Sequence, residues 1–123
     1  MSFSWRSAEE YRSTKYPGVK YRVVKMSMGR RIDLTRRVKD MMKKLEFLNA
    51  GSSTNDKVDA AILAGEMDRL YWDFGLEAIE GLDINGEQTS LNGQFEKGPE
   101  DLSREILMRI KQNIQLSQDE QKN

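Results

Sequence analysis

The sequence predicts an α+β fold that is mostly helical, with an N-terminal β-hairpin followed by three main helices and a small turn between the second and the third helix. Apolar and basic residues alternate after Pro17-Gly18, as they do in a half-buried strand. Three later stretches repeat apolar residues every three or four positions, as amphipathic helices do. A chain of 123 residues has the length of one domain, so we expect these elements to share one core.

The N-terminal part of the chain is predicted to form an arm and then the hairpin. Residues 1–17 contain aromatic side chains that follow neither a helical nor a strand period, so we expect an arm there. The hairpin is predicted from the alternating run at residues 19–26, a glycine-containing loop at residues 27–30, and a second alternating run at residues 32–34.

The first predicted helix spans residues 36–48 and begins after Thr35, which is a suitable N-cap residue. Its apolar side chains share one side of the helix because of their spacing. They are Val38, Met41, Met42, Leu45 and Leu48. Methionine side chains adapt to irregular partner surfaces, so Met41 and Met42 are candidate partner-binding residues.

The second predicted helix spans residues 56–79 and carries apolar stripes on two nearly opposite sides. The first stripe consists of Leu63, Met67, Leu70 and Phe74. A helix that is apolar on two sides is either enclosed by its own fold or binds a partner with the second side. Both alternatives are open from the sequence. In the second alternative the partner-binding residues are Trp72, Leu76 and Ile79.

Glycines and prolines mark the ends of elements in the rest of the chain. Gly81 suits the position after a helix, Asn85-Gly86 predicts a tight type I′ turn, and Gly98-Pro99 predicts the start of the last helix. The apolar stripe of that helix consists of Leu102, Ile106, Ile110 and Ile114. We expect a single helical domain at residues 18–116 and a frayed polar tail at residues 117–123.

The charges are distributed unevenly along a chain whose net charge is zero. Residues 1–48 hold 13 Lys and Arg against 5 Asp and Glu, whereas residues 49–123 hold 7 against 15. Such halves can pack against each other, attract neighbouring copies, or include a basic nucleic-acid face. The sequence pI of about 6.3 argues against a nucleic-acid partner.

The composition argues against an enzyme. The chain has no histidine and no cysteine, which removes the commonest general base, the commonest metal ligand and any thiolate nucleophile or thiolate metal site. Glu77 and Glu80 have the spacing of a solvated helix face. We therefore expect no catalytic residues, no cofactor and no metal. We also expect a cytoplasmic protein without a membrane partner, because the sequence shows neither a secretory signal nor a run of about 20 apolar residues.

The second half of the chain contains a series of segments separated by glycines. They are Trp72, residues 77–82 (EAIEGL), residues 84–87 (INGE), residues 98–102 (GPEDL) and Glu105-Ile106. This series resembles the tail assembly chaperones of long-tailed bacteriophages and prophages, and the resemblance covers about residues 19–116. It implies a protein that coats the tape-measure protein and then hands over to tail tube subunits. It also implies self-association along the client, in the cytoplasm of the bacterial host.

Two other classes of function remain open from the sequence. The first is a structural phage component, such as a tail or neck subunit that stays in the particle. The composition of the virion would distinguish this class from a chaperone. The second is a nucleic-acid-binding regulator that uses the basic first half of the chain, and its binding would weaken steeply with added salt.

Overall fold

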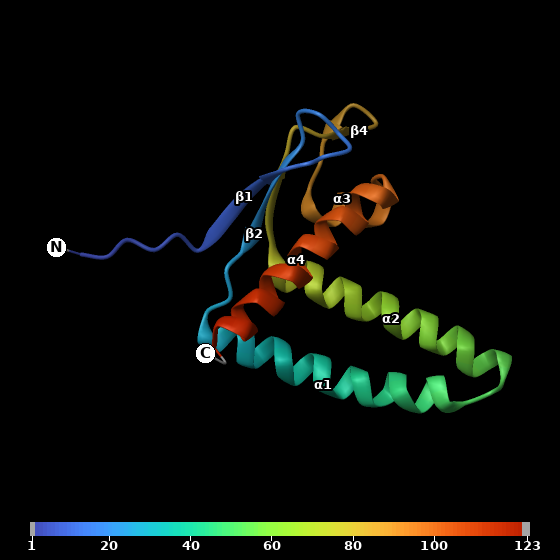
Figure 1. Ribbon diagram of the computed structural model, residues 1–123. Coiled ribbons are helices and arrows are strands. Elements are labelled where there is room, and N and C mark those ends of the chain that lie inside the picture. The colour runs from blue at the N-terminus through green and yellow to red at the C-terminus, as the bar shows by residue number, and fades with distance from the viewer. Residues whose placement is uncertain (1, 122–123) are drawn as a thin grey trace. The chain divides into compact units, whose positions relative to one another are not determined.

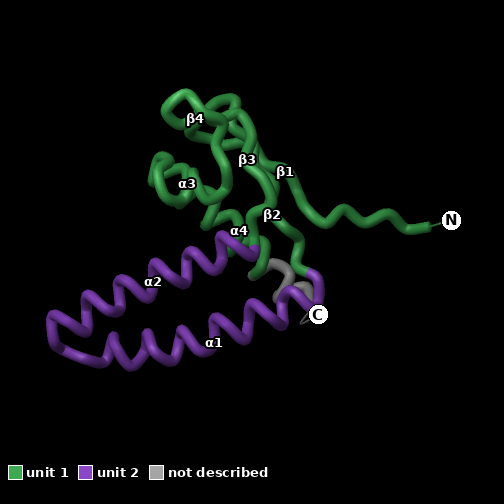
Figure 2. Tube along the Cα trace, turned by 180° about the vertical axis from the view of Figure 1, so that it is seen from behind, with its two compact units in different colours: residues 1–26, 75–123 green, residues 27–74 purple. Residues whose placement is uncertain are grey.

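The structure, a computed structural model, describes the backbone of residues 2–121 and the side chains of residues 2–114. In chain order its elements (Figure 1) are β1 (Ala8–Arg12), β2 (Lys20–Val24), α1 (Met28–Ala50), α2 (Thr54–Gly75), β3 (Leu76–Glu80), β4 (Asp83–Ile84), β5 (Glu87–Gln88), α3 (Leu91–Lys97) and α4 (Glu100–Gln121). They confirm an α+β fold that is mostly helical and begins with a β-hairpin. The chain forms two compact units (Figure 2), which we call unit 1 (residues 1–26 and 75–123) and unit 2 (residues 27–74).

Unit 1 contains a three-stranded antiparallel sheet in the order β1-β2-β3. Within β2, Tyr21 lies opposite Tyr11 of β1 and Ile79 of β3. Successive side chains of a strand point to opposite sides of the sheet, so one side can be apolar and the other polar. The apolar side packs with α4 to form the core of the unit. The buried core residues are Val19, Tyr21, Val23, Leu76, Ile79, Leu102, Ile106, Leu107 and Ile110.

The sequence of α4 explains why this helix packs on the sheet. Pro99 directly precedes the helix, and the acidic Glu100 and Asp101 lie in its first turn, where the helix dipole favours negative charge. Leu102, Ile106 and Ile110 recur every four residues, and each is 0% exposed. Complete burial of such a side chain contributes about 1.5–3 kcal/mol, so this stripe is a main source of stability in unit 1.

The strands β4 and β5 form a small hairpin around Asn85-Gly86. These two residues have positive φ angles of 55° and 83°, as the predicted type I′ turn requires. Gly81 also has a positive φ angle, 82°, and a Cβ atom there would collide with the carbonyl oxygen of Gly18. Gly81 follows β3 and not a helix, so the prediction of a helix end at this glycine is wrong.

Unit 2 is a helical hairpin. The helices α1 and α2 run side by side in opposite directions and are joined by residues 51–53 (Figure 1, Figure 2). The N-cap of α1 is Ser27, whose hydroxyl oxygen accepts a hydrogen bond from the backbone N–H of Arg30 at 3.2 Å. Thr35 therefore lies inside α1, and the prediction that Thr35 is the N-cap of this helix is wrong.

The β-hairpin uses different strands from those that the sequence predicts. Its first strand, β1, lies within the expected arm at residues 1–17. This strand is at the edge of the sheet and is mostly polar (AEEYR), so no alternation marks it. The expected second strand, residues 32–34, belongs to α1 because Leu34 continues the helical spacing of Val38 and Met41.

The ends of two helices also differ from the predictions. The second predicted helix extends to residue 79, but α2 ends at Gly75. The helix α4 continues to Gln121, so residues 117–121 are helical where a frayed tail is expected, and residues 122–123 lie outside the described residues. Among the helices of residues 2–121, none is long and apolar enough to cross a membrane.

Candidate functional site

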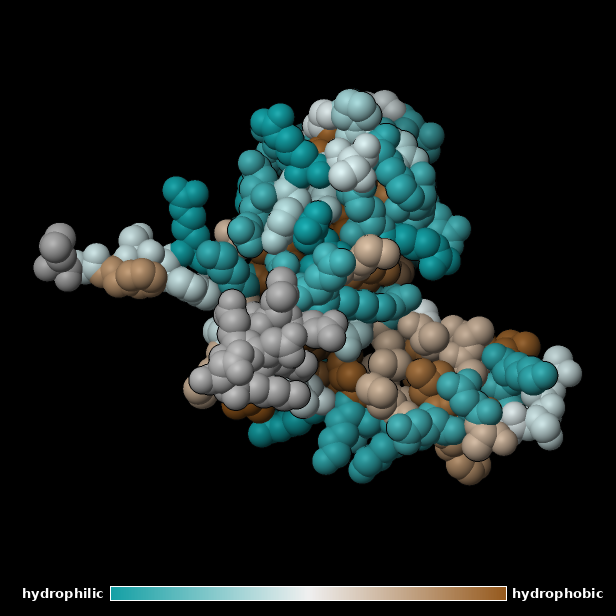
Figure 3. Space-filling view, in the orientation of Figure 1, coloured by the Kyte–Doolittle hydropathy of each residue, from teal (hydrophilic) through white to brown (hydrophobic). Residues whose placement is uncertain are grey.

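The helical hairpin of unit 2 carries apolar stripes that its two helices cover only in part. Each stripe is spaced by alternating steps of three and four residues, as in a coiled coil. Leu34 and Ala60 are buried, with 3% and 7% of their surface exposed. The half-buried members are Val38, Met41, Leu45, Leu48, Leu63, Met67, Leu70 and Phe74. Two helices cover each other along one line only, so apolar surface (brown) stays visible along the hairpin in Figure 3.

Two neighbouring hollows form a groove between α1 and α2. One hollow, with a volume of about 530 Å³, is lined by Lys43, Lys44, Phe47, Leu48, Asp59, Ile62, Leu63 and Glu66. The other, with a volume of about 430 Å³, is lined by Arg37, Asp40, Met41, Glu66, Arg69, Leu70 and Asp73. Glu66 lines both hollows, so we treat them as one feature and call it the groove.

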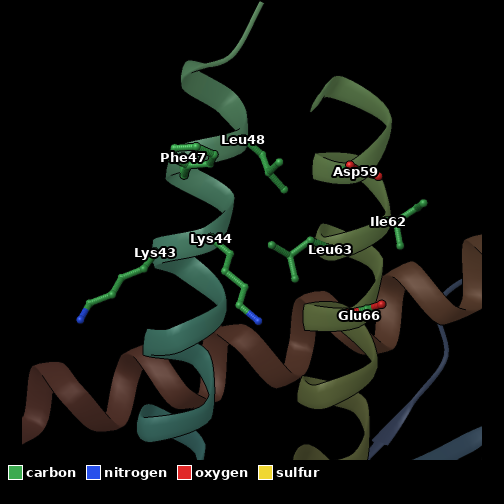
Figure 4. A pocket seen from close by; sticks show the side chains of 8 residues that line it. All are labelled: Lys43, Lys44, Phe47, Leu48, Asp59, Ile62, Leu63 and Glu66. Atoms are coloured by element: carbon green, nitrogen blue, oxygen red, sulfur yellow. The ribbon is translucent and has the colours of Figure 1, made fainter. Parts of the chain in front are cut away.

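Large apolar side chains are exposed on both sides of the groove. Phe47 of α1 is 79% exposed and Ile62 of α2 is 57% exposed. Leu48 and Leu63 point toward the space between the two helices, with Phe47 and Ile62 farther out (Figure 4). Exposed apolar side chains that gather beside a hollow with a charged rim are typical of a protein-interaction surface.

The two rims of the groove carry opposite charge. The α1 rim has three basic side chains and one acidic side chain, Asp40; the basic ones are Arg37, Lys43 and Lys44. The α2 rim has three acidic side chains and one basic side chain, Arg69; the acidic ones are Asp59, Glu66 and Asp73. A partner that covers this groove therefore meets a basic rim on one side and an acidic rim on the other.

Arg30 fastens the hairpin at the end away from its loop. Its Nε and Nη2 atoms donate hydrogen bonds to the carbonyl oxygen of Phe74 at 2.9 and 2.7 Å. Its guanidinium also lies over the Phe74 ring, 5.0 Å from the centroid, and that of Arg37 lies 5.4 Å from the same centroid. The last carbonyls of a helix have no partner within the helix, so a cation there is stabilising. These contacts hold α1 beside α2 and so maintain the groove.

Three of the predicted partner-binding residues do not lie on an accessible face. Trp72, Leu76 and Ile79 are 1%, 4% and 7% exposed. Leu76 and Ile79 belong to β3, where they face the core of unit 1, and only Trp72 lies in α2. The prediction that these three side chains form a second stripe on one helix is therefore wrong, because the helix ends before the last two.

The two predicted methionines lie on the hairpin. Met41 is half-buried and lines the groove. Met42 is 44% exposed and is not among the residues that line the groove. Adjacent residues of a helix point about 100° apart, so Met41 and Met42 face different directions. The participation of both methionines in binding stays a prediction.

Phe47 and Ile62 are the two exposed large apolar side chains of the groove, and the sequence does not predict them as partner-binding residues. Both side chains lie outside the regularly spaced apolar stripes of their helices, and those stripes are the pattern that predicts apolar contact surfaces. The available signal was a large apolar residue at a position where the helix period places polar residues. Phe47, between Glu46 and the stripe residue Leu48, is the clearer of the two cases.

A polar cluster in unit 1 joins the loop after β1 to α4. The Oε1 atom of Glu105 accepts hydrogen bonds from Ser13 Oγ at 3.2 Å, Thr14 N at 3.0 Å and Thr14 Oγ1 at 2.8 Å. Burial alone would raise the pKa of Glu105, but the hydrogen bonds from Thr14 and Ser13 hold it below its usual value. Ser13 and Thr14 donate these hydrogen bonds to a side chain of the same protein, so the cluster has a structural role: it holds the loop after β1 on α4. Across the described residues, no group of three or more acidic side chains could hold a metal ion.

Comparison with known proteins adds no relative. No family model, no curated protein and no solved structure matches the chain. The groove, with its apolar side chains and its two charged rims, is the candidate functional site of this protein.

Proposed function

We propose that this protein is an assembly chaperone that binds an amphipathic helix of a client protein in the groove. The observation that carries the proposal is the exposure of large apolar side chains along a groove that two helices leave open. Amphipathic helices dock in such grooves through apolar anchors spaced by three or four residues. A third helix along the groove would cover the half-buried Met41, Leu63 and Leu70 and would complete a three-helix arrangement. The action is reversible binding and not catalysis.

The resemblance to phage tail assembly chaperones supports a specific client. A tape-measure protein is a long helical chain with apolar stripes, so it offers many successive helices to copies of this groove. In this proposal the copies coat the tape-measure protein in the cytoplasm of the bacterial host. Tail tube subunits then replace them, which requires binding that is reversible.

Burial of Phe47 and Ile62 against a client helix would contribute measurably to the free energy of binding. Complete burial of a Phe or Ile side chain contributes about 1.5–3 kcal/mol. Since 1.4 kcal/mol corresponds to about a factor of ten in Kd, Phe47 and Ile62 each account for about tenfold or more. Loss of either side chain should therefore weaken client binding without unfolding the protein, because both are exposed in the free chain.

Copurification of this protein with the tape-measure protein of the same genome tests the proposal. The variants Phe47→Asp and Ile62→Asp are expected to lose the tape-measure protein. The matched control is Met108→Asp, which changes a side chain on α4 that is 62% exposed and lies outside the groove. Equal retention by all three variants contradicts the assignment of the groove. Recovery of this protein from purified virions would favour a structural tail or neck subunit instead.

A further inference from the structure

We infer that, in the absence of a client, the groove is covered by the groove of a second copy, so that two hairpins form a four-helix bundle. The inference concerns the partner of the groove described above, and its regulatory consequence rests on the proposed function. Four-helix bundles cover apolar stripes that two helices leave half-exposed. The hairpin supplies two stripes of matching length, on α1 and on α2, and most of their members are half-buried in a single copy.

Symmetry leaves two ways to bring one groove onto another with the helices aligned. In both, the same surface of each copy is used, and a two-fold axis lies in the plane of contact. If the axis is perpendicular to the helices, α1 lies over α1 of the second copy. If the axis is parallel to the helices, α1 lies over α2 of the second copy, and the two helices run antiparallel. Each position along the length of one groove then meets the same position along the other groove.

The charges of the rims select the second arrangement. An axis perpendicular to the helices would place the basic α1 rim on a basic rim and the acidic α2 rim on an acidic rim. An axis parallel to the helices places Lys43 and Lys44 over Asp59 and Glu66 of the second copy, because all four line the same hollow. Like charges across an interface suppress the wrong arrangement and opposite charges favour the right one.

The same arrangement brings the exposed apolar side chains together. Phe47 and Ile62 lie on opposite sides of one hollow, so rotation about an axis parallel to the helices places Phe47 of each copy near Ile62 of the other. The dimer therefore buries the same side chains that a client helix would bury. It follows that dimer formation and client binding exclude each other, and that a client separates the dimer.

Charge reversal and mixing of variants test this arrangement in the full-length protein. Lys43→Glu with Lys44→Glu makes both rims acidic, and Asp59→Lys with Glu66→Lys makes both rims basic. Each double variant alone is expected to self-associate at least about tenfold more weakly, measured by sedimentation over a range of concentrations. An equimolar mixture is expected to dimerise again, because each charge then meets its opposite in both contacts between the copies.

A control separates these contacts from a general effect of charge. Lys39→Glu with Lys57→Glu makes the same change in net charge as Lys43→Glu with Lys44→Glu, but at exposed positions outside the groove. The dimer of this control variant should be nearly as stable as the wild-type dimer. Mixing that fails to restore dimers, or a monomeric wild type at every concentration, overturns the inference.

Cysteine cross-linking identifies which helices meet, since the wild-type chain contains no cysteine. Phe47→Cys mixed with Ile62→Cys is expected to form mainly the mixed disulfide on mild oxidation. Preferred linkage of Phe47→Cys to itself would place α1 over α1 and contradict the inference. The result is independent of the proposed function: a monomer that copurifies with the tape-measure protein refutes only the dimer, and a dimer that fails to copurify refutes only the chaperone role.

Discussion

Replacement of Leu76 by Ala tests whether this side chain belongs to the core or to a partner-binding face. Leu76 is 4% exposed and lies in β3. Truncation of a buried Leu to Ala costs about 2–5 kcal/mol, because contacts are lost and a cavity remains. Unfolding entropy is about 2.1 cal/mol/K per residue, so for a chain of this length 1 kcal/mol corresponds to about 4 °C in Tm. We therefore expect Leu76→Ala to lower Tm by about 8–20 °C.

Thermal unfolding followed by circular dichroism is the appropriate measurement, with Met108→Ala as the matched control. Met108 is 62% exposed, and its truncation should change the free energy of unfolding by less than about 0.5 kcal/mol, or about 2 °C. A domain of this size is stable by about 5–15 kcal/mol, so Leu76→Ala should still fold at room temperature. If Leu76→Ala leaves Tm unchanged but removes client binding, the reasoning from burial is refuted and Leu76 belongs to a binding face.

Three further substitutions test the turns and the polar cluster of unit 1. Gly86→Ala should cost about 1–2 kcal/mol of unfolding free energy, because its φ angle is positive while its surroundings are open. Gly81→Ala should cost more, since it adds a collision with Gly18, and equal urea midpoints for the two variants would contradict this account. The lowered pKa of Glu105 means that its stabilising effect is present above the unfolded pKa of about 4.3 and is lost as pH falls through the folded value. The stability difference between wild type and Glu105→Gln should therefore shrink from neutral pH to about pH 3, and a difference that is independent of pH would refute the assignment.

Local sequence was sufficient to predict the parts of this fold that form by local contacts. The apolar spacing of residues 38–48 and of Leu102 to Ile110 predicts helices that the structure contains. Asn85-Gly86 predicts its turn because few residues adopt two successive positive φ angles. In each case the hydrogen bonds or the backbone angles involve residues that are close in sequence, so the residues themselves carry the information.

Only the tertiary structure decided the strands at residues 8–12 and 76–80 and, with them, the location of the candidate site. The segment Leu76–Glu80 (LEAIE) is rich in residues that favour helices, and its period continues that of α2. It nevertheless forms a strand because β2, far away in the sequence, supplies its hydrogen-bond partners, and Leu76 and Ile79 lie opposite the buried Val23 and Tyr21 of that strand. Helical hydrogen bonds close within four residues, whereas a strand depends on a partner that the local sequence does not contain. Spacing alone places Phe47 and Ile62 outside the apolar stripes of α1 and α2. That they lie on the two sides of one groove follows only from the packing of α1 beside α2, which joins residues distant in sequence.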